Sequence, residues 1–337
     1  MTALAAQERA QRGWVVFFAI FLLWYMGARD TVGCDWWGYL HRFNVVPLNQ
    51  PFTAILSDFD EPGFWLLMKF VRENGLHYLW LNFIATVIML ICFVVFCRAH
   101  RNSLVILALM FPVIIVQLGM SGIRQGIAVG FVLVASVAWM RGSKSWTGIW
   151  ILVGSLFHTS VLMFLPLVPM AGRKVTTAWL FGATALLSPL VVFLMGDRVE
   201  TYSDRYLDNS DITSNGALLR YILLLIPAVF YWKYKDKLKV AFPESFELMR
   251  LTTALTFSLI PVAIFSSILL HRVIYYIMPL SILTFVALAH VAFPKMGRKS
   301  VLFLPIAVYG LYSVAWFLFS YHANVCYIPY QNFWSPF

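Results

Sequence analysis

Charged residues are scarce in this 337-residue chain. Asp, Glu, Lys and Arg make up 12% of it, whereas about 25% is usual for soluble domains. Hydrophobic residues make up 61%, and the mean hydropathy is +0.78. This composition excludes an ordinary soluble domain and predicts a membrane protein. No segment long enough for a separate soluble domain remains between the apolar runs, so we expect a single transmembrane domain over residues 1–337.

Several catalytic signatures are also missing. The sequence contains no phosphate-binding glycine loop, zinc motif, nucleophile elbow or kinase signature. Acidic residues are absent from the predicted spanning cores, which argues against a proton-coupled or cation-coupled transporter. We therefore expect no metal, no cofactor and no nucleic-acid partner.

Cysteine is rare as well, with four in the chain. Cys92 and Cys97 fall on or at the end of one apolar run, where we expect them to pack as small hydrophobic residues. Cys34 and Cys326 both fall on the predicted outer side of the membrane. A disulfide between them is one alternative, and unpaired thiols are the alternative that we favour. The cysteine spacing matches no metal-binding motif.

Apolar runs of spanning length dominate the chain, and short basic clusters separate alternate pairs of them. The first run has no small-x-small cleavage site after it, so we expect an uncleaved helix. Inner loops are enriched in Lys and Arg, which lets the clusters define the topology. The runs lie near 14–27, 76–97, 103–120, 123–140, 147–171, 176–196, 217–232, 250–270, 273–293 and 301–320.

The run 147–171 decides the number of crossings. As a single span it would strand the basic segment 233–250 outside the cell, whereas a break near Phe157-His158-Thr159 returns every basic cluster to the cytoplasm. Each half then has about 12 residues, too few to cross at 1.5 Å per residue, so we predict a short broken hairpin. The result is an all-α polytopic membrane protein with about 11 transmembrane helices, its N-terminus in the cytoplasm and its C-terminus outside.

Residues 28–75 form the longest predicted outer segment. Pro62 suits a first helical turn, and Asp60 and Glu61 precede it as candidate caps. The apolar face of the following stretch consists of Phe64, Leu67, Met68 and Val71, opposite Lys69, Arg72 and Glu73. This pattern predicts an amphipathic helix over 62–73 that lies along the outer membrane surface.

Aromatic and polar residues also mark the outer side. Trp36, Trp37 and Tyr39 fit either a belt at the lipid headgroups or stacking against sugar rings, and the sequence leaves both open. Residues 197–216 form a second polar outer loop, either a binding lid or a solvated connector.

Four cationic or titratable residues lie at predicted outer helix ends, against the general trend that places positive charge inside. They are Arg124, His158, Arg220 and Arg272. A single arginine there can snorkel to the interface or cap a neighbouring helix. Several together indicate a bound anion, because helix N-termini already carry positive partial charge. The planar fork of arginine suits phosphate oxygens, so a lipid-linked pyrophosphate fits this pattern.

Five short motifs follow one another along most of the chain in an order that resembles a known family. The resemblance is to the EpsG-type, Wzy-like bacterial polysaccharide polymerases, which make O-antigen or exopolysaccharide. The motifs are Gly33-x-Asp35-x3-Tyr39, Glu61-Pro62-Gly63-Phe64, Ile123-Arg124-Gln125, Phe157-His158-x-Ser160 and Arg272-x2-Tyr275. The loop 197–216 has no counterpart that can be carried over.

The resemblance implies a GT-C-like helical fold and a metal-independent glycosyltransferase in the bacterial inner (plasma) membrane. Its implied substrates are oligosaccharide repeat units on undecaprenyl pyrophosphate, joined at the outer face. Membrane lipid is an expected partner, and a chain-length regulator is left open. The alternatives are a GT-C-type polysaccharide ligase, a membrane O-acyltransferase and a lipid-linked oligosaccharide flippase.

Within this hypothesis, the cationic residues bind pyrophosphate and stabilise the leaving group. Arg124 and Arg272 are the first choices, and the remaining candidates are Arg220, Arg205, Gln125 and Tyr275.

A base would help to activate the acceptor hydroxyl. His158 is our first choice, with Asp35 and Glu61 as the other candidates. Each has a structural alternative. His158 could bind a carbonyl that the broken helix leaves free, Asp35 could pair with Arg29 or Arg42, and Glu61 could cap its helix.

Overall fold

The computed structural model describes residues 3–47, 49–58, 60–173, 215–297 and 300–334, together with 176, 178, 180 and 182. These residues form helices and connecting turns, with one isolated antiparallel bridge between Arg29 and Asn332. The prediction of an all-α chain is confirmed for them. Apart from a few edge residues, the predicted span 176–196 and the loop 197–216 lie outside the described residues, and so does Arg205.

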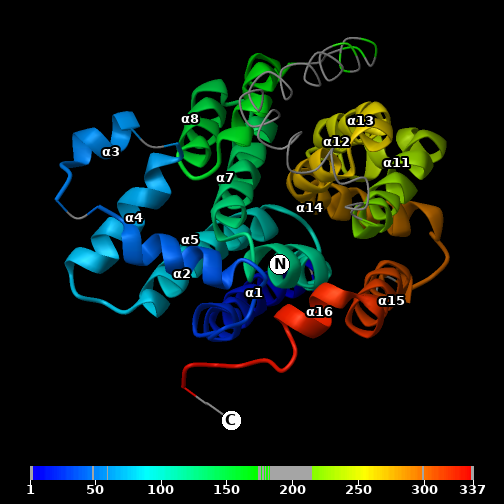
Figure 1. Ribbon diagram of the computed structural model, residues 1–337. Helices are drawn as coiled ribbons and strands as arrows, with labels where there is room; N and C mark the ends of the chain where they lie inside the picture. Colours follow the sequence, from blue (N-terminus) through cyan, green and yellow to red (C-terminus); the bar gives the residue numbers. More distant parts are fainter. Residues whose placement is uncertain are drawn as a thin grey trace. The chain divides into compact units, whose positions relative to one another are not determined.

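The chain divides into two compact units (Figure 1). The first comprises Met1–Val134, Leu152–Thr159 and Ile306–Phe337, and the second comprises Ala135–Ile151 and Ser160–Pro305. The first contains α1 (Ala3–Gly27), α2 (Trp36–Val45), α3 (Phe52–Asp58), α4 (Pro62–Glu73), α5 (Tyr78–Ala99), α6 (Ser103–Met110), the π-helix η1 (Phe111–Gly119), most of α7 (Ile123–Met140), most of α15 (Phe303–Phe319) and α16 (Tyr321–Cys326). The second contains most of α8 (Lys144–Ser155), most of the 3-10 helix η2 (Thr159–Met170), α11 (Asn215–Ala241), α12 (Phe246–Ser258), α13 (Ile260–Phe265), α14 (Ser267–Ala292) and η3 (Ser300–Leu302).

Seven helical segments of the described chain are long and apolar enough to cross a membrane. They are Glu8–Gly27, Tyr78–Ala99, Ile123–Met140, Gly216–Ala241, Phe246–Ile264, Ser267–Ala292 and Ser300–Phe319. Two shorter apolar helical segments, Ser103–Gly119 and Thr159–Met170, lie among them. The set fits a multi-pass membrane protein, and the count of about 11 crossings stays a prediction.

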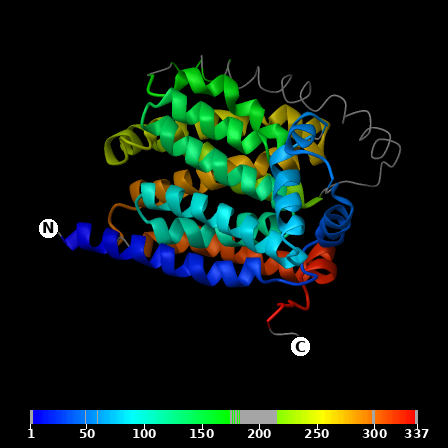
Figure 2. The same ribbon diagram turned by 90° about the vertical axis from the view of Figure 1, so that its left-hand side faces the viewer.

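Long apolar helices pack together at the centre of each unit. In the first, α1 and α5 lie side by side along their lengths (Figure 2), and Phe93 and Phe96 of α5 are fully buried. Cys92 and Cys97 are buried free thiols on the same helix, as predicted. In the second, α14 packs against α11 and α12 and is buried along nearly its whole length. An apolar helix with no polar face belongs in a protein core or in lipid, which explains both arrangements.

The predicted break in the run 147–171 is confirmed. Helix α8 ends at Ser155, a turn covers residues 156–158, and η2 begins at Thr159. The predicted start of α7 is also confirmed, because η1 ends at Gly119 and α7 begins at Ile123. These two turns supply His158 and Arg124 respectively.

Helix α4 begins at Pro62 and ends at Glu73, as predicted, but its environment differs from the prediction. Phe64, Met68 and Val71 are at most 1% exposed, so this face packs inside the protein and does not face lipid. Lys69 was expected on the polar face but is only 2% exposed, with its ammonium bonded to Glu73. Glu61 lies at the N-cap position of α4, as predicted, but its side chain makes no capping hydrogen bond.

The aromatic residues of α2 are more buried than a lipid belt or an open sugar platform requires. Trp36 is 5% exposed and meets Tyr78 edge-on, and Tyr39 is 6% exposed and packs against Phe64. Trp37 alone of the three predicted belt residues is open, at 66% exposure. Two of the three therefore belong to the core of the first unit.

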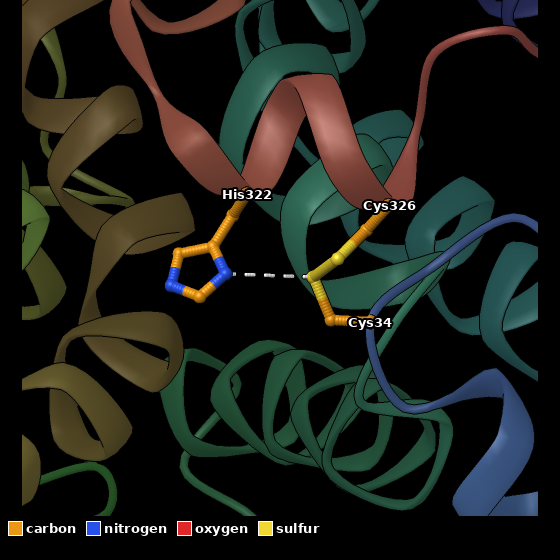
Figure 3. A group of neighbouring side chains, drawn as sticks. All are labelled: Cys34, His322 and Cys326. Atoms are coloured by element: carbon orange, nitrogen blue, oxygen red, sulfur yellow. Dashed lines mark hydrogen bonds between the residues drawn. A yellow bond between two sulfur atoms is a disulfide. The ribbon is translucent and has the colours of Figure 1, made fainter.

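A disulfide joins Cys34 to Cys326 across 292 residues of sequence (Figure 3). Our favoured prediction of unpaired thiols is therefore wrong. The bond ties the loop before α2 to the end of α16, and both belong to the first unit. His322 lies one helical turn before Cys326, and its Nδ1 is 3.7 Å from the Cys34 Sγ.

Candidate functional site

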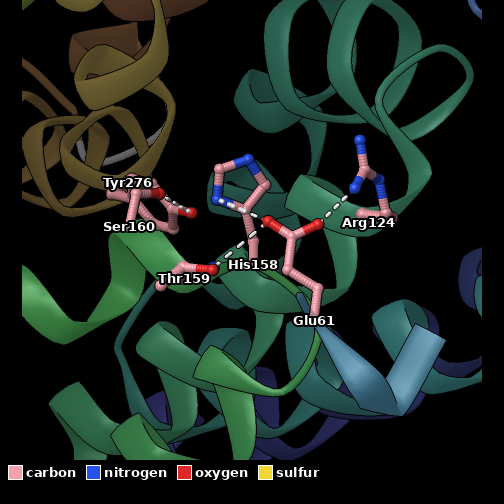
Figure 4. Close-up of polar contacts among 6 residues, drawn as sticks. All are labelled: Glu61, Arg124, His158, Thr159, Ser160 and Tyr276. Carbon is pink, nitrogen blue, oxygen red and sulfur yellow. Dashed lines mark hydrogen bonds and ion pairs between the residues drawn. The ribbon is translucent and has the colours of Figure 1, made fainter. Parts of the chain in front are cut away.

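Three of the predicted site residues meet in the first unit, around the carboxylate of Glu61 (Figure 4). The Arg124 guanidinium donates to Oε2 of Glu61 through Nη1. The Thr159 amide donates to Oε1 at 3.3 Å, and Nδ1 of His158 lies 3.9 Å from the same oxygen. The start of α4, the start of α7 and the break after α8 are thus joined by one carboxylate.

Backbone contacts explain why α4 and the broken hairpin meet here. A helix start leaves amide hydrogens without partners, and a helix break leaves carbonyl oxygens without partners. The Gly63 amide donates to the Leu156 carbonyl at 2.9 Å and satisfies both. A Cβ on Gly63 would lie 3.0 Å from the Leu156 carbonyl oxygen, so glycine permits this close approach.

Glu61 is almost completely buried, whereas its partners are partly open. The side chain of Glu61 is 1% exposed, that of His158 13% and that of Arg124 25%. A buried carboxylate is costly unless a cation and hydrogen bonds compensate it, and Arg124 and the Thr159 amide do so here. The alternative that Glu61 acts as a helix cap is therefore wrong. Its carboxylate instead orients Arg124.

The Arg124 guanidinium retains donor capacity for a ligand. Its side chain is 25% exposed, so part of the guanidinium is open, whereas its Nε is buried and has no hydrogen-bond partner among the described residues. Its Cζ lies 5.9 Å from the centre of the Tyr39 ring, which packs along the guanidinium. Arginine carries five N–H donors, so the bond to Glu61 leaves others for a phosphate group.

Tyr39 is a neighbour of this site, whereas the sequence predicts it to lie in a lipid belt or to stack against sugar rings. Burial raises the pKa of its hydroxyl above the ordinary value, and the Arg124 guanidinium acts in the opposite direction. The phenol therefore stays neutral at physiological pH and keeps its proton for hydrogen bonding. The sequence signal that could have identified it is its place at the end of the Gly33-x-Asp35-x3-Tyr39 motif.

Asp35 directly precedes α2, and its carboxylate contacts the turn before α7 and does not pair with Arg29. Its Oδ2 accepts a hydrogen bond from Ser121 Oγ at 3.1 Å, and its carboxylate is exposed. Arg29 is 1% exposed and instead donates to the Met120 carbonyl at 3.1 Å and to other backbone oxygens. The predicted Asp35–Arg29 pair is therefore wrong. Arg42, the other predicted partner, lies with its Cζ 6.0 Å from the Tyr39 ring centre.

The second unit contains a separate polar cluster between α11 and α14. Arg220, which is 6% exposed, donates to the Tyr275 hydroxyl at 3.2 Å, and its Cζ lies 5.5 Å from that ring. Its Nη2 lies 2.6 Å from Nδ1 of His271. Because a guanidinium can only donate, Nδ1 must accept, and the imidazole carries its proton on Nε2. This arrangement places N–H donors from two side chains together.

His271 was missed by sequence reasoning, although it lies one helical turn before the predicted Tyr275.

Two other predicted pyrophosphate ligands, Arg272 and Gln125, lie outside this cluster of Arg220, His271 and Tyr275. Arg272 is half-buried in the second turn of α14, so its predicted place at a helix start is wrong, because α14 begins at Ser267. Gln125 is 9% exposed beside Arg124 in the first turn of α7.

One group in the described part of the chain brings three potential metal-ligand side chains together, namely Cys34, His322 and Cys326. Their ligand atoms lie within 4.8 Å of one another. Cysteine binds metals as a thiolate, and both sulfurs here are joined in the disulfide (Figure 3). Local spacing could not have revealed the group, because 292 residues separate its cysteines.

Comparison with known proteins gives one match. A family model described as the EpsG family matches residues 13–332, which include every residue of both polar clusters. Nothing among curated proteins or solved structures matches the chain. Because the match covers nearly the whole sequence, the chain belongs to the EpsG family.

Proposed function

We propose that the protein joins oligosaccharide repeat units carried on undecaprenyl pyrophosphate into a surface polysaccharide. The reaction takes place at the outer face of the bacterial inner membrane, with the N-terminus in the cytoplasm. Family membership points to a membrane protein of the polysaccharide polymerase type and supports this proposal. The observation that carries it is the pairing of Arg124 with a buried Glu61 beside His158.

In the proposed reaction, the growing chain leaves its lipid pyrophosphate and joins a hydroxyl of the next lipid-linked unit. The bond from the sugar C1 to the pyrophosphate oxygen breaks, so negative charge develops on the pyrophosphate. Arg124 stabilises that charge, because Glu61 holds one edge of the guanidinium and leaves other N–H donors for phosphate oxygens. Positioned donors of this kind contribute several kcal/mol to a transition state.

His158 is the proposed base that takes the proton of the acceptor hydroxyl. Glu61 Oε1 lies 3.9 Å from its Nδ1, beyond hydrogen-bond distance but close enough for the carboxylate charge to stabilise the imidazolium that forms. The two oxygens of Glu61 already contact Arg124 and the Thr159 amide, so we assign Glu61 a positioning role. Asp35 is the alternative base, since its carboxylate is exposed near the same turn.

The cluster of Arg220, His271 and Tyr275 is proposed as a second pyrophosphate site, and Arg272 as a further cation of the same unit. Donor and acceptor are both lipid-linked, so each reaction involves two pyrophosphate groups. A guanidinium and a fixed imidazole N–H suit phosphate oxygens. Arg205 remains a proposed phosphate ligand outside the described residues.

Reconstitution tests this function. The purified protein is placed in lipid vesicles with one purified lipid-linked repeat unit and no other protein, and the glycans are separated by size. We expect a ladder of longer lipid-linked glycans. Binding of the repeat unit without any extension would refute the polymerase. Transfer to a different acceptor, such as a lipid A core that is added in a parallel reaction, would indicate the ligase instead.

A further inference from the structure

The turn that precedes Arg124 is held by the loop at residues 29–35. Arg29 Nε donates to the Met120 carbonyl at 3.1 Å, and Ser121 Oγ donates to Asp35 Oδ2 at 3.1 Å. Gly33 packs directly against this turn with a φ of +108°, and a Cβ there would lie 2.0 Å from the Met120 carbonyl oxygen. Because only glycine fits there, loop and turn form one interlocked surface.

The C-terminal segment in turn holds both partners. The Gly33 amide donates to the Cys326 carbonyl at 2.7 Å, and the Asp30 amide donates to the Gln331 carbonyl at 3.0 Å. The Tyr327 hydroxyl donates to the Gln117 carbonyl at 3.2 Å, at the end of η1 just before the turn. Residues 326–331 therefore contact the loop on one side and the base of the turn on the other.

Residues 326–331 and the loop 29–35 together form a brace for this turn. We infer that the Cys34–Cys326 disulfide closes this brace covalently and that the brace positions Arg124. The disulfide is the one covalent link described between the C-terminal segment and the loop 29–35. Arg124 follows the braced turn by two residues, in the first turn of a helix, so displacement of the turn moves the guanidinium relative to Glu61. Cys34 and Cys326 are thus positioning residues. Their effect on catalysis rests on the proposed function.

The bond is open to reduction. Cys34 is exposed and Cys326 is half-buried, so a small dithiol can reach them. A thiolate of the dithiol attacks Cys326 Sγ and Cys34 leaves as a thiolate, which His322 Nδ1 can hydrogen-bond from 3.7 Å. The second thiol of the reagent then releases Cys326. The dithiol becomes a disulfide, and its two electrons and two protons end on Cys34 and Cys326 as thiols.

Amide hydrogen exchange measures the brace without reference to activity. Purified wild-type protein is compared before and after dithiol treatment, with mass spectrometry confirming that both cysteines are reduced. We expect amides of residues 30–36 and 119–124 to exchange at least several-fold faster after reduction, while α14 is unchanged. The double variant Cys34→Ser/Cys326→Ser should exchange fast from the start and ignore the dithiol. Unchanged exchange in fully reduced wild-type protein would overturn the inference.

The catalytic consequence is measured separately with the lipid-linked repeat unit. Because displacement of a binding group by about 1 Å can lower rates by up to about 100-fold, we expect kcat/KM to fall at least tenfold on reduction. We expect much of the loss in kcat, because Arg124 stabilises charge that develops in the transition state, and we expect recovery on reoxidation. Faster exchange with unchanged KM and kcat would refute the positioning of Arg124. If reduction speeds amide exchange but even the oxidised protein extends no repeat unit, the polymerase is refuted and the brace stands.

Discussion

Replacing Glu61 with Gln removes the negative charge that Arg124 contacts but preserves the size of the side chain. Loss of one partner of a buried ion pair costs about 3–5 kcal/mol of folding free energy. The Arg124 side chain is 25% exposed and partly solvated, so we expect about 2–3 kcal/mol for Glu61→Gln. The amide oxygen of Gln can still accept from the Thr159 amide, so the change acts mainly through Arg124.

A double-mutant cycle isolates this pair. Glu61→Gln, Arg124→Gln and the combined variant are unfolded by SDS titration in mixed micelles, and the free energy of unfolding is compared with that of wild type. The combined variant leaves no uncompensated charge, so it should be more stable than the sum of the single effects predicts, by about 1–2 kcal/mol. Effects that add to within about 0.5 kcal/mol would show that the two residues are not coupled and would refute the proposed site geometry.

Two further predictions concern stability in the first unit. Burial lowers the pKa of His100 from 6.5 to about 4, so the unfolded chain takes up this proton first as the pH falls. The free energy of unfolding should therefore decrease by about 3 kcal/mol in total as the pH falls from about 6.5 to below 4, and His100→Asn should lack this component. Gly33→Ala should destabilise the protein by about 3 kcal/mol or more, because its Cβ would clash with the Met120 carbonyl, whereas Gly38→Ala in α2, which meets nothing within 4 Å, should be tolerated. Thermal unfolding followed by circular dichroism measures the pH dependence due to His100 and the stability of the two glycine variants. Equal melting temperatures for Gly33→Ala and Gly38→Ala would contradict the close packing at Gly33.

Local features of this fold could be predicted because they depend on short-range patterns. Pro62 marks the start of α4, and the Met120-Ser121-Gly122 turn marks the start of α7. The break at residues 156–158 followed from the distribution of charge along the chain, which bears on topology even where hydropathy is continuous. These predictions needed no knowledge of tertiary contacts.

The roles of the individual side chains could not be predicted in this way. Glu61 is at a position where a cap is usual, and only the approach of α7 and the hairpin break shows that it binds Arg124. Both interpretations of Tyr39 place its ring at a surface, and its burial against Phe64 excludes both. The Cys34–Cys326 disulfide joins residues that no local spacing relates. In each case the deciding contact is long-range.

The most direct test of the central claim is Arg124→Lys, which keeps the positive charge and removes the planar fork. A charge-assisted hydrogen bond contributes about 1.5–3 kcal/mol, so kcat/KM for extension of the lipid-linked repeat unit should fall by about 10-fold to 100-fold. Arg98→Lys is the matched control, because Arg98 is exposed at the far end of α5 and should retain wild-type activity. A loss confined to Arg124→Lys, with normal protein levels, is the result that we predict. Equal activity of the two variants and the wild type would contradict the proposed role of Arg124.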